Sequence, residues 1–368
     1  MFSPFFLNQF GFNSNNQFNY NNKEKQKDQA PPWLKHLPPT QKLNLHADIH
    51  HFTKYIQLNS SEKEKRKTAI DSVQKVIDTI CIKTVNGKPR MSFQPPVKPS
   101  RVTVYGSEKS NLAFPYSDID LSIGGDLLEY NISNIFTFIS DALIDSCVCE
   151  EIARYTHIKV PILKLKTLQD GINIDISFNN TVGIESTRFI GNLCHKNSLL
   201  RPLVILIRYI LNQGGFTSVI AGGLNTYMIT LLVYSFLTMY NTGNLTGGEP
   251  DKDLGSVFVT FLQHFGYDFD YEMHGISIGE KCYYFDKAKR GWKDEKRPCM
   301  LTIENPLDPT VNLTPNAFLT LQMKDYFVYC LEQILPEKGD EIYWSTPINS
   351  RLQRIIHLTE ELKNRSKS

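Results

Sequence analysis

Long apolar runs are scarce in this sequence. The longest uncharged apolar stretch, MITLLVYSFLTMY at 228–240, is too short to span a bilayer, so we expect a buried core helix and no membrane contact. The first residues, MFSPFFLNQFGF, lack both the basic segment and the unbroken apolar segment of a secretory signal. We therefore expect neither a membrane protein nor a secreted one.

Closely paired cysteines are also absent. The seven cysteines show no CxxC spacing and no zinc-finger histidine pattern, and their number is odd. Disulfide-stapled and zinc-ribbon proteins are therefore disfavoured, and a reducing compartment without structural metal is indicated.

The sequence has almost no excess of charge of one sign. Lys and Arg total 40 against 38 Asp and Glu, which gives a net charge of +2. There is no RNP motif, KH loop or zinc knuckle. Any contact with nucleic acid should therefore be a local groove or be supplied by a partner, and binding by the chain alone should be weak and salt-sensitive.

What is present is enough apolar material for two domains. The chain has 368 residues, of which 41% are apolar and 11% aromatic. Residues 1–44, which begin with an Asn- and Phe-rich stretch, are expected to form a disordered tail. Strand patterns and helical patterns then follow in separate regions, with the change near residue 184. The predicted strands cover 101–106, 118–123, 160–168 and 172–178.

Two of these strands carry carboxylates on one face. In YSDIDLSI, Asp118 and Asp120 alternate with apolar residues, and INIDISF places Asp175 in the same alternation. Three carboxylates on one sheet face repel each other unless divalent cations lie among them, and Mg²⁺ or Mn²⁺ prefer such oxygen ligands. The alternative is that all three are solvated strand residues, which the repeated pattern disfavours.

A carboxylate cluster of this kind suits in-line nucleotidyl transfer assisted by two metal ions. The pair Gly106 and Ser107 ends the strand that precedes Asp118. A glycine there allows the backbone to approach a phosphate closely, and the serine hydroxyl and turn amides can bind phosphate oxygens.

Several stretches together resemble a known family. YGSEKSNLAFPYSDIDL, VPILKLKTLQDGINIDISFNNTVGIES, AGGLNTYMITLLVYSFL and LTIENPLDPTVNLTPNAF are similar to the noncanonical poly(A) polymerases of the Trf class, also called DNA polymerase sigma, within the DNA polymerase β-type nucleotidyltransferase superfamily. The resemblance extends from about residue 45 to 362. It implies an α+β fold, with a small mixed-sheet nucleotidyltransferase (palm) domain at 61–184. This domain is expected to be inserted into a mostly α-helical central domain made of 45–60 and 185–362.

The resemblance also assigns roles to residues of the strand region. Asp118, Asp120 and Asp175 match the metal-binding triad, and Asp175 is expected to take the proton of the primer 3′-hydroxyl as well. Gly106 and Ser107 match the phosphate-binding turn.

Four residues of the helical region match nucleotide contacts. Tyr227 matches the aromatic residue on which the base stacks, and Thr226 stands where the family usually has a phosphate-contacting Ser. Arg208 replaces a triphosphate-contacting Lys, and Asn312 lies in a nucleotide-recognition loop at 304–318. Without the family, a core position explains Tyr227 better than a nucleotide contact does, and Arg208 could pair with a carboxylate.

The loop bears on which nucleotide is used. Uridylyl-transferring relatives often carry a His just before the Asn of this loop, and that position is Val311 here. ATP is therefore the expected substrate and AMP addition to RNA 3′ ends the expected activity. A uridylyltransferase, a small-molecule nucleotidyltransferase and a non-catalytic scaffold of an RNA-surveillance complex are the alternatives.

Partners and location follow from the resemblance alone. It implies a zinc-knuckle RNA-binding protein and an RNA helicase as partners, as in the TRAMP complex. It also implies a nuclear or nucleolar role in RNA surveillance and 3′-end processing.

Overall fold

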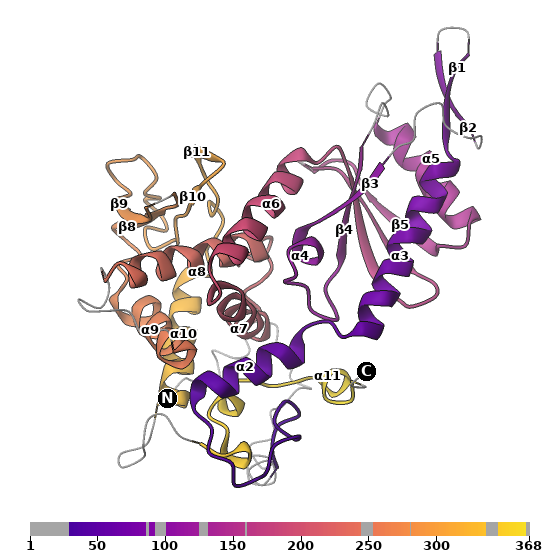
Figure 1. Cartoon of the computed structure of the whole chain (residues 1–368). Helices are drawn as coiled ribbons and strands as arrows, with labels where there is room; N and C mark the ends of the chain where they lie inside the picture. Colours follow the sequence, from indigo (N-terminus) through magenta and orange to yellow (C-terminus); the bar gives the residue numbers. More distant parts are fainter. Residues whose placement is uncertain are drawn as a thin grey trace. The chain divides into compact units, whose positions relative to one another are not determined.

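The computed structural model describes residues 29–85, 88–92, 101–124, 132–158, 160–243, 253–279, 281–335 and 345–365. The chain divides into two compact units (Figure 1). We call Ile56–Lys196 the sheet unit, and the described residues up to Tyr55 and from Asn197 to Arg365 the helical unit. The predicted α+β class is confirmed, because a mixed sheet and a mostly helical region occupy different units.

The sheet unit is built on a five-stranded sheet with strand order β3-β4-β7-β6-β5. Only β4 and β7 run parallel, and the other neighbours are antiparallel. The strands are β3 (Arg101–Tyr105), β4 (Ile119–Gly124), β5 (Cys149–Tyr155), β6 (Ile162–Thr167) and β7 (Asn173–Phe178). The chain enters β7 from β6 through a tight turn in which Gly171 has a φ of +64° and donates its N–H to Thr167 O.

Two helices, α3 (Ser60–Thr79) and α5 (Ile132–Asp145), cover one face of this sheet (Figure 1). The apolar residues of β4, β6 and β7 pack beneath them; Ile119, Leu163 and Ile176 are fully buried. Each such side chain contributes about 1.5–3 kcal/mol through its removal from water. Because strand side chains alternate, this packing turns the polar residues of the same strands to the opposite, open face.

The remaining described elements of the sheet unit are short or lie at its margins. They are the hairpin β1 (Cys81–Val85) and β2 (Lys88–Ser92), the single-turn α4 (Gly106–Lys109) and α6 (Thr181–Lys196). α6 contacts both α4 and β3, which places its side chains beside the Gly106 turn.

The helical unit contains most of the described helices and two small hairpins. Its helices are α2 (Leu45–Ile56), α7 (Leu200–Gln213), α8 (Thr226–Asn241), α9 (Leu254–Gln263), η3 (His264–Asp268), α10 (Thr320–Ile334), η4 (Pro347–Asn349), η5 (Leu352–Arg354) and α11 (Glu360–Lys363). Its strands are β8 (His274–Ser277), β9 (Tyr283–Asp286), β10 (Glu304–Asn305) and β11 (Asp308–Asn312). As expected for 228–240, α8 is a core helix with most of its side chains buried. No helix among the described residues has the length and apolar character that crossing a membrane requires.

The predicted disordered tail, 1–44, differs from the structure in part. Residues 1–28 lie outside the described residues, but 29–44 are described, and Trp33 and Leu34 are buried. Trp33 Nε1 donates to Asp48 Oδ1 at 2.8 Å, and Leu43 forms an isolated bridge with Ser345. The prediction is therefore wrong for 29–44, because its apolar side chains pack into the helical unit.

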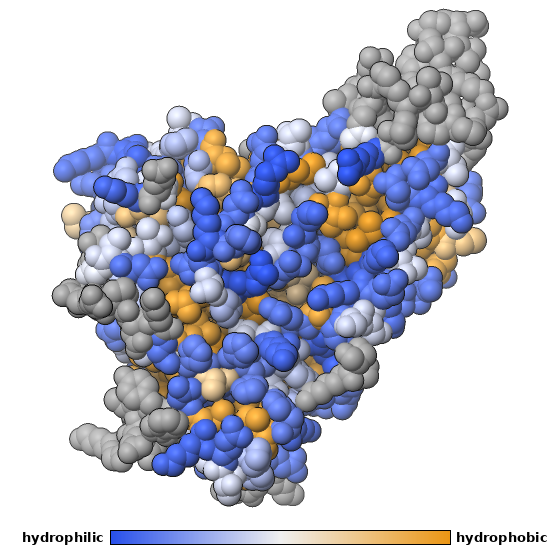
Figure 2. Space-filling model, viewed as in Figure 1, coloured by the Kyte–Doolittle hydropathy of each residue, from blue (hydrophilic) through white to orange (hydrophobic). Residues whose placement is uncertain are grey.

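Hydrophilic residues predominate on the face drawn in Figure 2, and hydrophobic ones show in separate areas. Single exposed apolar residues are ordinary on folded proteins. Among the described residues the most exposed large apolar side chain is Ile220, at 96%.

Candidate functional site

Three aspartates gather on the open face of the sheet, as the sequence predicts. Asp120 of β4 lies directly opposite Asp175 of β7 in the parallel pair, and Asp118 comes immediately before β4. Neighbouring strands are about 4.8 Å apart, so this register makes Asp120 and Asp175 neighbours on the same face of the sheet. The alternation of apolar and acidic residues in the two strands produces this arrangement.

A lysine that sequence reasoning missed lies against these carboxylates. Lys164 of β6 is the register partner of Asp175, and its Nζ donates to Asp175 Oδ2 at 2.5 Å. The same ammonium lies 4.0 Å from Asp118 Oδ2. The alternation in VPILKLKTL contained the signal, because it puts Lys164 on the face opposite Leu163 and Leu165.

Burial and charge act in opposite directions on this pair. Burial raises the pKa of the Asp175 carboxyl, and the nearby Asp118 raises it further, although the hydrogen bond and charge of Lys164 lower it. For Lys164, burial alone would lower the pKa, but the hydrogen bond and charge of Asp175 raise it overall. Loss of water thus dominates at Asp175, which suits this carboxylate for accepting a proton.

The Gly106 turn adjoins the same cluster. Gly106 has a φ of +67°, and a Cβ at this position would lie 2.0 Å from Asp120 Oδ2. Its N–H donates to Thr187 Oγ1 at 2.8 Å, and that hydroxyl in turn donates to Gly183 O. Glycine is therefore required by the approach of the Asp120 carboxylate, and the Gly106 amide is engaged within the protein. Ser107, which is 8% exposed, follows it in α4.

The donor set fits a hard divalent cation. In the part of the chain that is described, no three His, Cys, Asp or Glu side chains converge as they would around a bound metal ion. However, Asp118 and Asp175 both face one positive charge, the Lys164 ammonium. Carboxylate oxygens turned toward a shared cation are the ligands that Mg²⁺ and Mn²⁺ prefer, so Asp118, Asp120 and Asp175 could hold such an ion.

In the helical unit, the structure brings Tyr227 to the predicted recognition loop. Tyr227 is half-buried in the first turn of α8, and its hydroxyl donates to Asn305 Oδ1 at 3.3 Å. Asn305 Oδ1 also accepts the N–H of Leu307, which closes the turn between β10 and β11. Asn305 was not among the predicted site residues.

Two glycines set the approach to α8. Gly222 has a φ of +88°, and a Cβ there would meet the Phe318 ring at 2.3 Å. A Cβ on Gly223 would meet Phe216 O at 2.2 Å. The segment 222–225 therefore packs against Phe216, which precedes α8 in the sequence, and against Phe318, which follows it. Asn225 then caps α8 by accepting the Met228 N–H.

Asn312 and Val311 lie on β11, at the other side of the loop. Asn312 pairs with Glu304 across the β10–β11 hairpin, and its Oδ1 accepts both the N–H and the hydroxyl of Thr314. Val311 is 40% exposed. Tyr227 and Asn312 therefore both contact strand β10. The Tyr227 hydroxyl donates to Asn305, and Asn312 is the register partner of Glu304.

Strand β10 is held firmly in place. Glu304 is buried, accepts the Ser277 hydroxyl at 3.1 Å and forms an ion pair with Arg290. Upstream, the buried Lys287 ammonium donates to three backbone carbonyls, those of Tyr271, Pro298 and Met300. A loop anchored in this way can present side chains in one fixed geometry.

The other two predicted residues lie on packed helices. Arg208 is half-buried on α7 between the buried Ile207 and Tyr209, and α7 packs against α8. Thr226 is the half-buried first residue of α8, and its carbonyl accepts the Thr230 hydroxyl.

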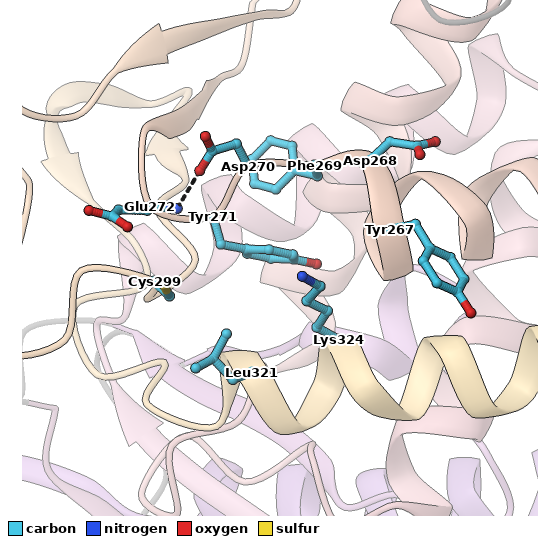
Figure 3. A pocket seen from close by; sticks show the side chains of 9 residues that line it. All are labelled: Tyr267, Asp268, Phe269, Asp270, Tyr271, Glu272, Cys299, Leu321 and Lys324. Carbon is cyan, nitrogen blue, oxygen red and sulfur yellow. Dashed lines mark hydrogen bonds between the residues drawn. The ribbon is translucent and has the colours of Figure 1, made fainter.

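A cavity of about 350 Å³ in the helical unit contains none of these residues (Figure 3). Asp270 on its rim accepts the backbone N–H groups of Glu272 and Met273, and Glu272 pairs with Lys293. Asp270 therefore stabilises a local turn, and Glu272 forms an ion pair. The predicted site residues lie elsewhere.

Comparison with known proteins finds matches in both units of the chain. The model of the poly(A) RNA polymerase, mitochondrial-like, central palm domain matches residues 45–193, and that of the Cid1 family poly A polymerase matches 253–311. Both segments of the chain are therefore similar to noncanonical poly(A) polymerases. The palm match contains Asp118, Asp120 and Asp175, and the second match contains Asn305 and Val311.

Two fungal proteins are among the relatives that this chain resembles over most of its length. Poly(A) RNA polymerase CID14 of Cryptococcus neoformans is 27% identical over 83% of this chain and 39% of its own length. Poly(A) RNA polymerase cid14 of Schizosaccharomyces pombe is 27% identical over 88% of this chain and 47% of its own length. The chain thus spans less than half the length of either relative.

Solved structures of the family share the fold. The polymerase core of TRAMP, an RNA surveillance complex, superimposes with a TM-score of 0.69 at 25% identity, covering 82% of this chain and 91% of that one. A structure of the Cid1 poly(U) polymerase gives a TM-score of 0.63 at 18% identity over 80% of this chain and 95% of that one, a likeness of fold alone.

Proposed function

We propose that this chain is a template-independent RNA 3′-terminal adenylyltransferase, which adds AMP from ATP to the 3′ end of an RNA. The observation that carries the proposal is the pairing of Asp120 with Asp175 on parallel strands, with Asp118 one residue upstream of β4. Similarity to noncanonical poly(A) polymerases supports the same reaction.

The chemistry is a single in-line displacement. The 3′-hydroxyl oxygen of the acceptor forms a bond to the α-phosphorus of ATP, the bond from that phosphorus to the pyrophosphate oxygen breaks, and the hydroxyl proton passes to Asp175. Burial raises the pKa of Asp175, which favours its role as the proton acceptor. Mg²⁺ or Mn²⁺ held by the three aspartates would supply the positive charge that such a displacement needs.

The chain's other residues orient the nucleotide. Ser107, in the turn fixed by Gly106 and Thr187, would bind phosphate oxygens, as would Arg208 and Thr226. Tyr227 offers a ring face on which a base can stack, with its hydroxyl oriented by Asn305.

Adenine is favoured over uracil by Val311, whose side chain has no hydrogen-bonding group to offer a uracil. The test is incorporation of each of the four nucleoside triphosphates on an oligo(A) primer, with Mg²⁺ and with Mn²⁺. Faster addition of UMP than of AMP would identify the chain as a uridylyltransferase instead.

One observation favours a second candidate, a non-catalytic scaffold. The relative named inactive non-canonical poly(A) RNA polymerase protein Trf4-2, of Drosophila melanogaster, is 26% identical over 77% of this chain and 66% of its own length. Sequence identity at this level therefore does not separate active from inactive members. The presence of all three aspartates supports the enzyme, and absence of any incorporation, with or without a partner, would support the scaffold.

The proposed setting is nuclear RNA surveillance. The similarity to the polymerase core of TRAMP supports RNA 3′ ends as acceptors, and a zinc-knuckle RNA-binding protein and an RNA helicase as partners. The net charge of +2 fits RNA affinity that is partly supplied by such a partner. Stimulation of tailing by an added zinc-knuckle protein, and nuclear staining of the tagged chain, test this setting.

A further inference from the structure

A groove adjoins the three aspartates on the open face of the sheet. Its volume is about 510 Å³, and all the residues that line it belong to the sheet unit. Its polar lining consists of Asp118, Glu151, Lys164, Lys166, Asn173 and Asp175.

The strand registers arrange these side chains in two rows across the sheet. One row runs from Lys164 through Asp175 to Asp120. The second row begins with Lys166, which pairs with Asn173. Asp118 lies at the level of Asn173, because it precedes Ile119, the partner of Ile174. The groove thus leads from the aspartates across β7 and β6 toward β5.

The two lysines of β6 differ in their partners. The Lys164 ammonium is bonded to Asp175, whereas Lys166 is exposed and its ammonium forms no hydrogen bond or ion pair with any described residue. The two positions lie about 7 Å apart along the strand. Lys166 therefore presents a positive charge on the groove that no ion pair with a described residue holds, next to an exposed amide at Asn173.

We propose that this groove binds the last nucleotides of the acceptor RNA, with Lys166 contacting a backbone phosphate just upstream of the terminal nucleotide. The inference rests on the proposed function, since an acceptor 3′-hydroxyl beside Asp175 obliges the rest of the strand to leave from that point. On the β3 side the face is closed by Tyr105, whose hydroxyl meets Ser177 and Asn180, and by the Gly106 turn. The β6 side is open and carries the positive charge that a phosphate needs.

Glu151 bounds the groove on β5. It is exposed, forms no hydrogen bond or ion pair within the described part of the chain, and its carboxylate repels a phosphate. The backbone should therefore stay near Lys166 and Asn173, and removal of the Glu151 charge should strengthen binding.

The experiment measures primer use and ATP use separately in the full chain. Lys166→Ala should raise KM for an oligo(A) primer about fivefold, and it should reduce the slope of log KM against log salt concentration by about 0.7, the value for one phosphate contact on a single strand. KM for ATP should change less than twofold. Glu151→Gln should lower the primer KM about twofold. Lys67→Ala is the matched control, because Lys67 is an exposed lysine on α3, the helix that covers the other face.

Two further measurements separate the possible failures. Fluorescence anisotropy of the labelled primer without ATP tests the groove even if the chain adds no nucleotide, in which case only the proposed function fails. Lys166→Arg should retain most primer affinity, because it keeps the charge. The groove assignment is overturned if Lys166→Ala alters primer binding no more than Lys67→Ala, or if Lys166→Arg is as impaired as Lys166→Ala.

Discussion

Asp175 in the sheet unit and Asp48 in the helical unit are both held away from water, and burial raises the pKa of both carboxyl groups. Their partners differ. Asp48 accepts hydrogen bonds from Trp33 Nε1, the Ser350 hydroxyl and the Leu352 N–H, which satisfy both of its oxygens. Among the described residues, the Asp175 carboxylate receives one donor, Lys164, and the nearby Asp118 carboxylate raises its pKa further.

The contrast separates a carboxylate that stabilises the fold from one left available for chemistry. Asp48 joins segments 302 residues apart in sequence, so its hydrogen bonds hold the two ends of the helical unit together. Asp175 joins only neighbouring strands that are already paired. Removal of Asp48 should therefore affect stability, and removal of Asp175 should affect activity.

Asp175→Asn and Asp120→Asn should give the largest effect. Each replaces a charged ligand by a neutral amide of the same shape, and loss of several kcal/mol of transition-state stabilisation corresponds to a fall in kcat of about 10³-fold or more. The melting temperature should stay within about 2 °C of wild type, because relief of carboxylate repulsion offsets the weakened ion pair between Asp175 and the half-exposed Lys164. Primer-extension kinetics and thermal melting measure the two quantities.

The control for this pair is Asp71→Ala, an exposed aspartate on α3. It should leave both kcat and the melting temperature unchanged. If Asp175→Asn retained more than about a tenth of wild-type kcat, the assignment of the triad would be wrong.

The contrast also shows what the sequence could predict. The three aspartates could be found because the alternation of polar and apolar residues in a strand is a local signal. The glycine at 171 is likewise a local signal, for the tight turn that joins β6 to β7. Strand β5 was missed, since it is a sheet-edge strand with mostly exposed side chains and carries no apolar alternation. The Lys164–Asp175 bond depends on register between two strands and could be recognised only once the pairing was known.

Long-range contacts account for the other errors. Residues 29–44 were included in the expected tail because the chain begins with an Asn- and Phe-rich stretch. Their order depends on Trp33 and on Asp48, whose other partners, Ser350 and Leu352, are near the C-terminal end. The link between Tyr227 and Asn305 spans 78 residues and left no local pattern either.

Asp48→Ala should have the next largest effect, this time on the helical unit. It leaves three buried donors without an acceptor, and each unsatisfied buried group costs about 1–3 kcal/mol, so the free energy of unfolding should fall by about 4 kcal/mol. Urea unfolding followed by tryptophan fluorescence measures the loss. The same Asp71→Ala variant is the control, and an unchanged unfolding free energy for Asp48→Ala would show that the hydrogen bonds do not hold the segments.

His264 extends the comparison to pH. Burial lowers the pKa of His264 to about 4, against 6.5 as the ordinary value, and its ring bonds the Tyr284 hydroxyl at 2.6 Å. The pKa of His264 is lower in the folded chain than in the unfolded one, so the folded chain favours the neutral ring. The resulting contribution to the free energy of unfolding is complete above pH 6.5 and is lost as the pH falls toward 4. The loss should reach about 3 kcal/mol, since a tenfold change in proton affinity corresponds to about 1.4 kcal/mol.

The measurement is urea unfolding at several pH values between 7.5 and 4.5. His264→Gln should flatten the pH dependence, whereas His195→Gln, at an exposed position on α6, should leave it as in wild type. Equal slopes for wild type and His264→Gln would contradict the prediction.

Tyr227 should give the smallest effects, and they divide between the ring and the hydroxyl. If the ring stacks on the adenine, Tyr227→Leu should raise KM for ATP by about 30-fold, because stacking of one base on an aromatic side chain is worth roughly 2 kcal/mol. Tyr227→Phe keeps the ring and removes only a 3.3 Å hydrogen bond to Asn305, so KM for ATP should rise no more than about threefold. A core tyrosine would behave differently: Tyr227→Leu would lower the melting temperature and leave KM for ATP unchanged. The ratio of the two KM values, measured beside thermal melting, therefore decides whether Tyr227 belongs with Asp175 as a residue for chemistry or with Asp48 as a residue for the fold.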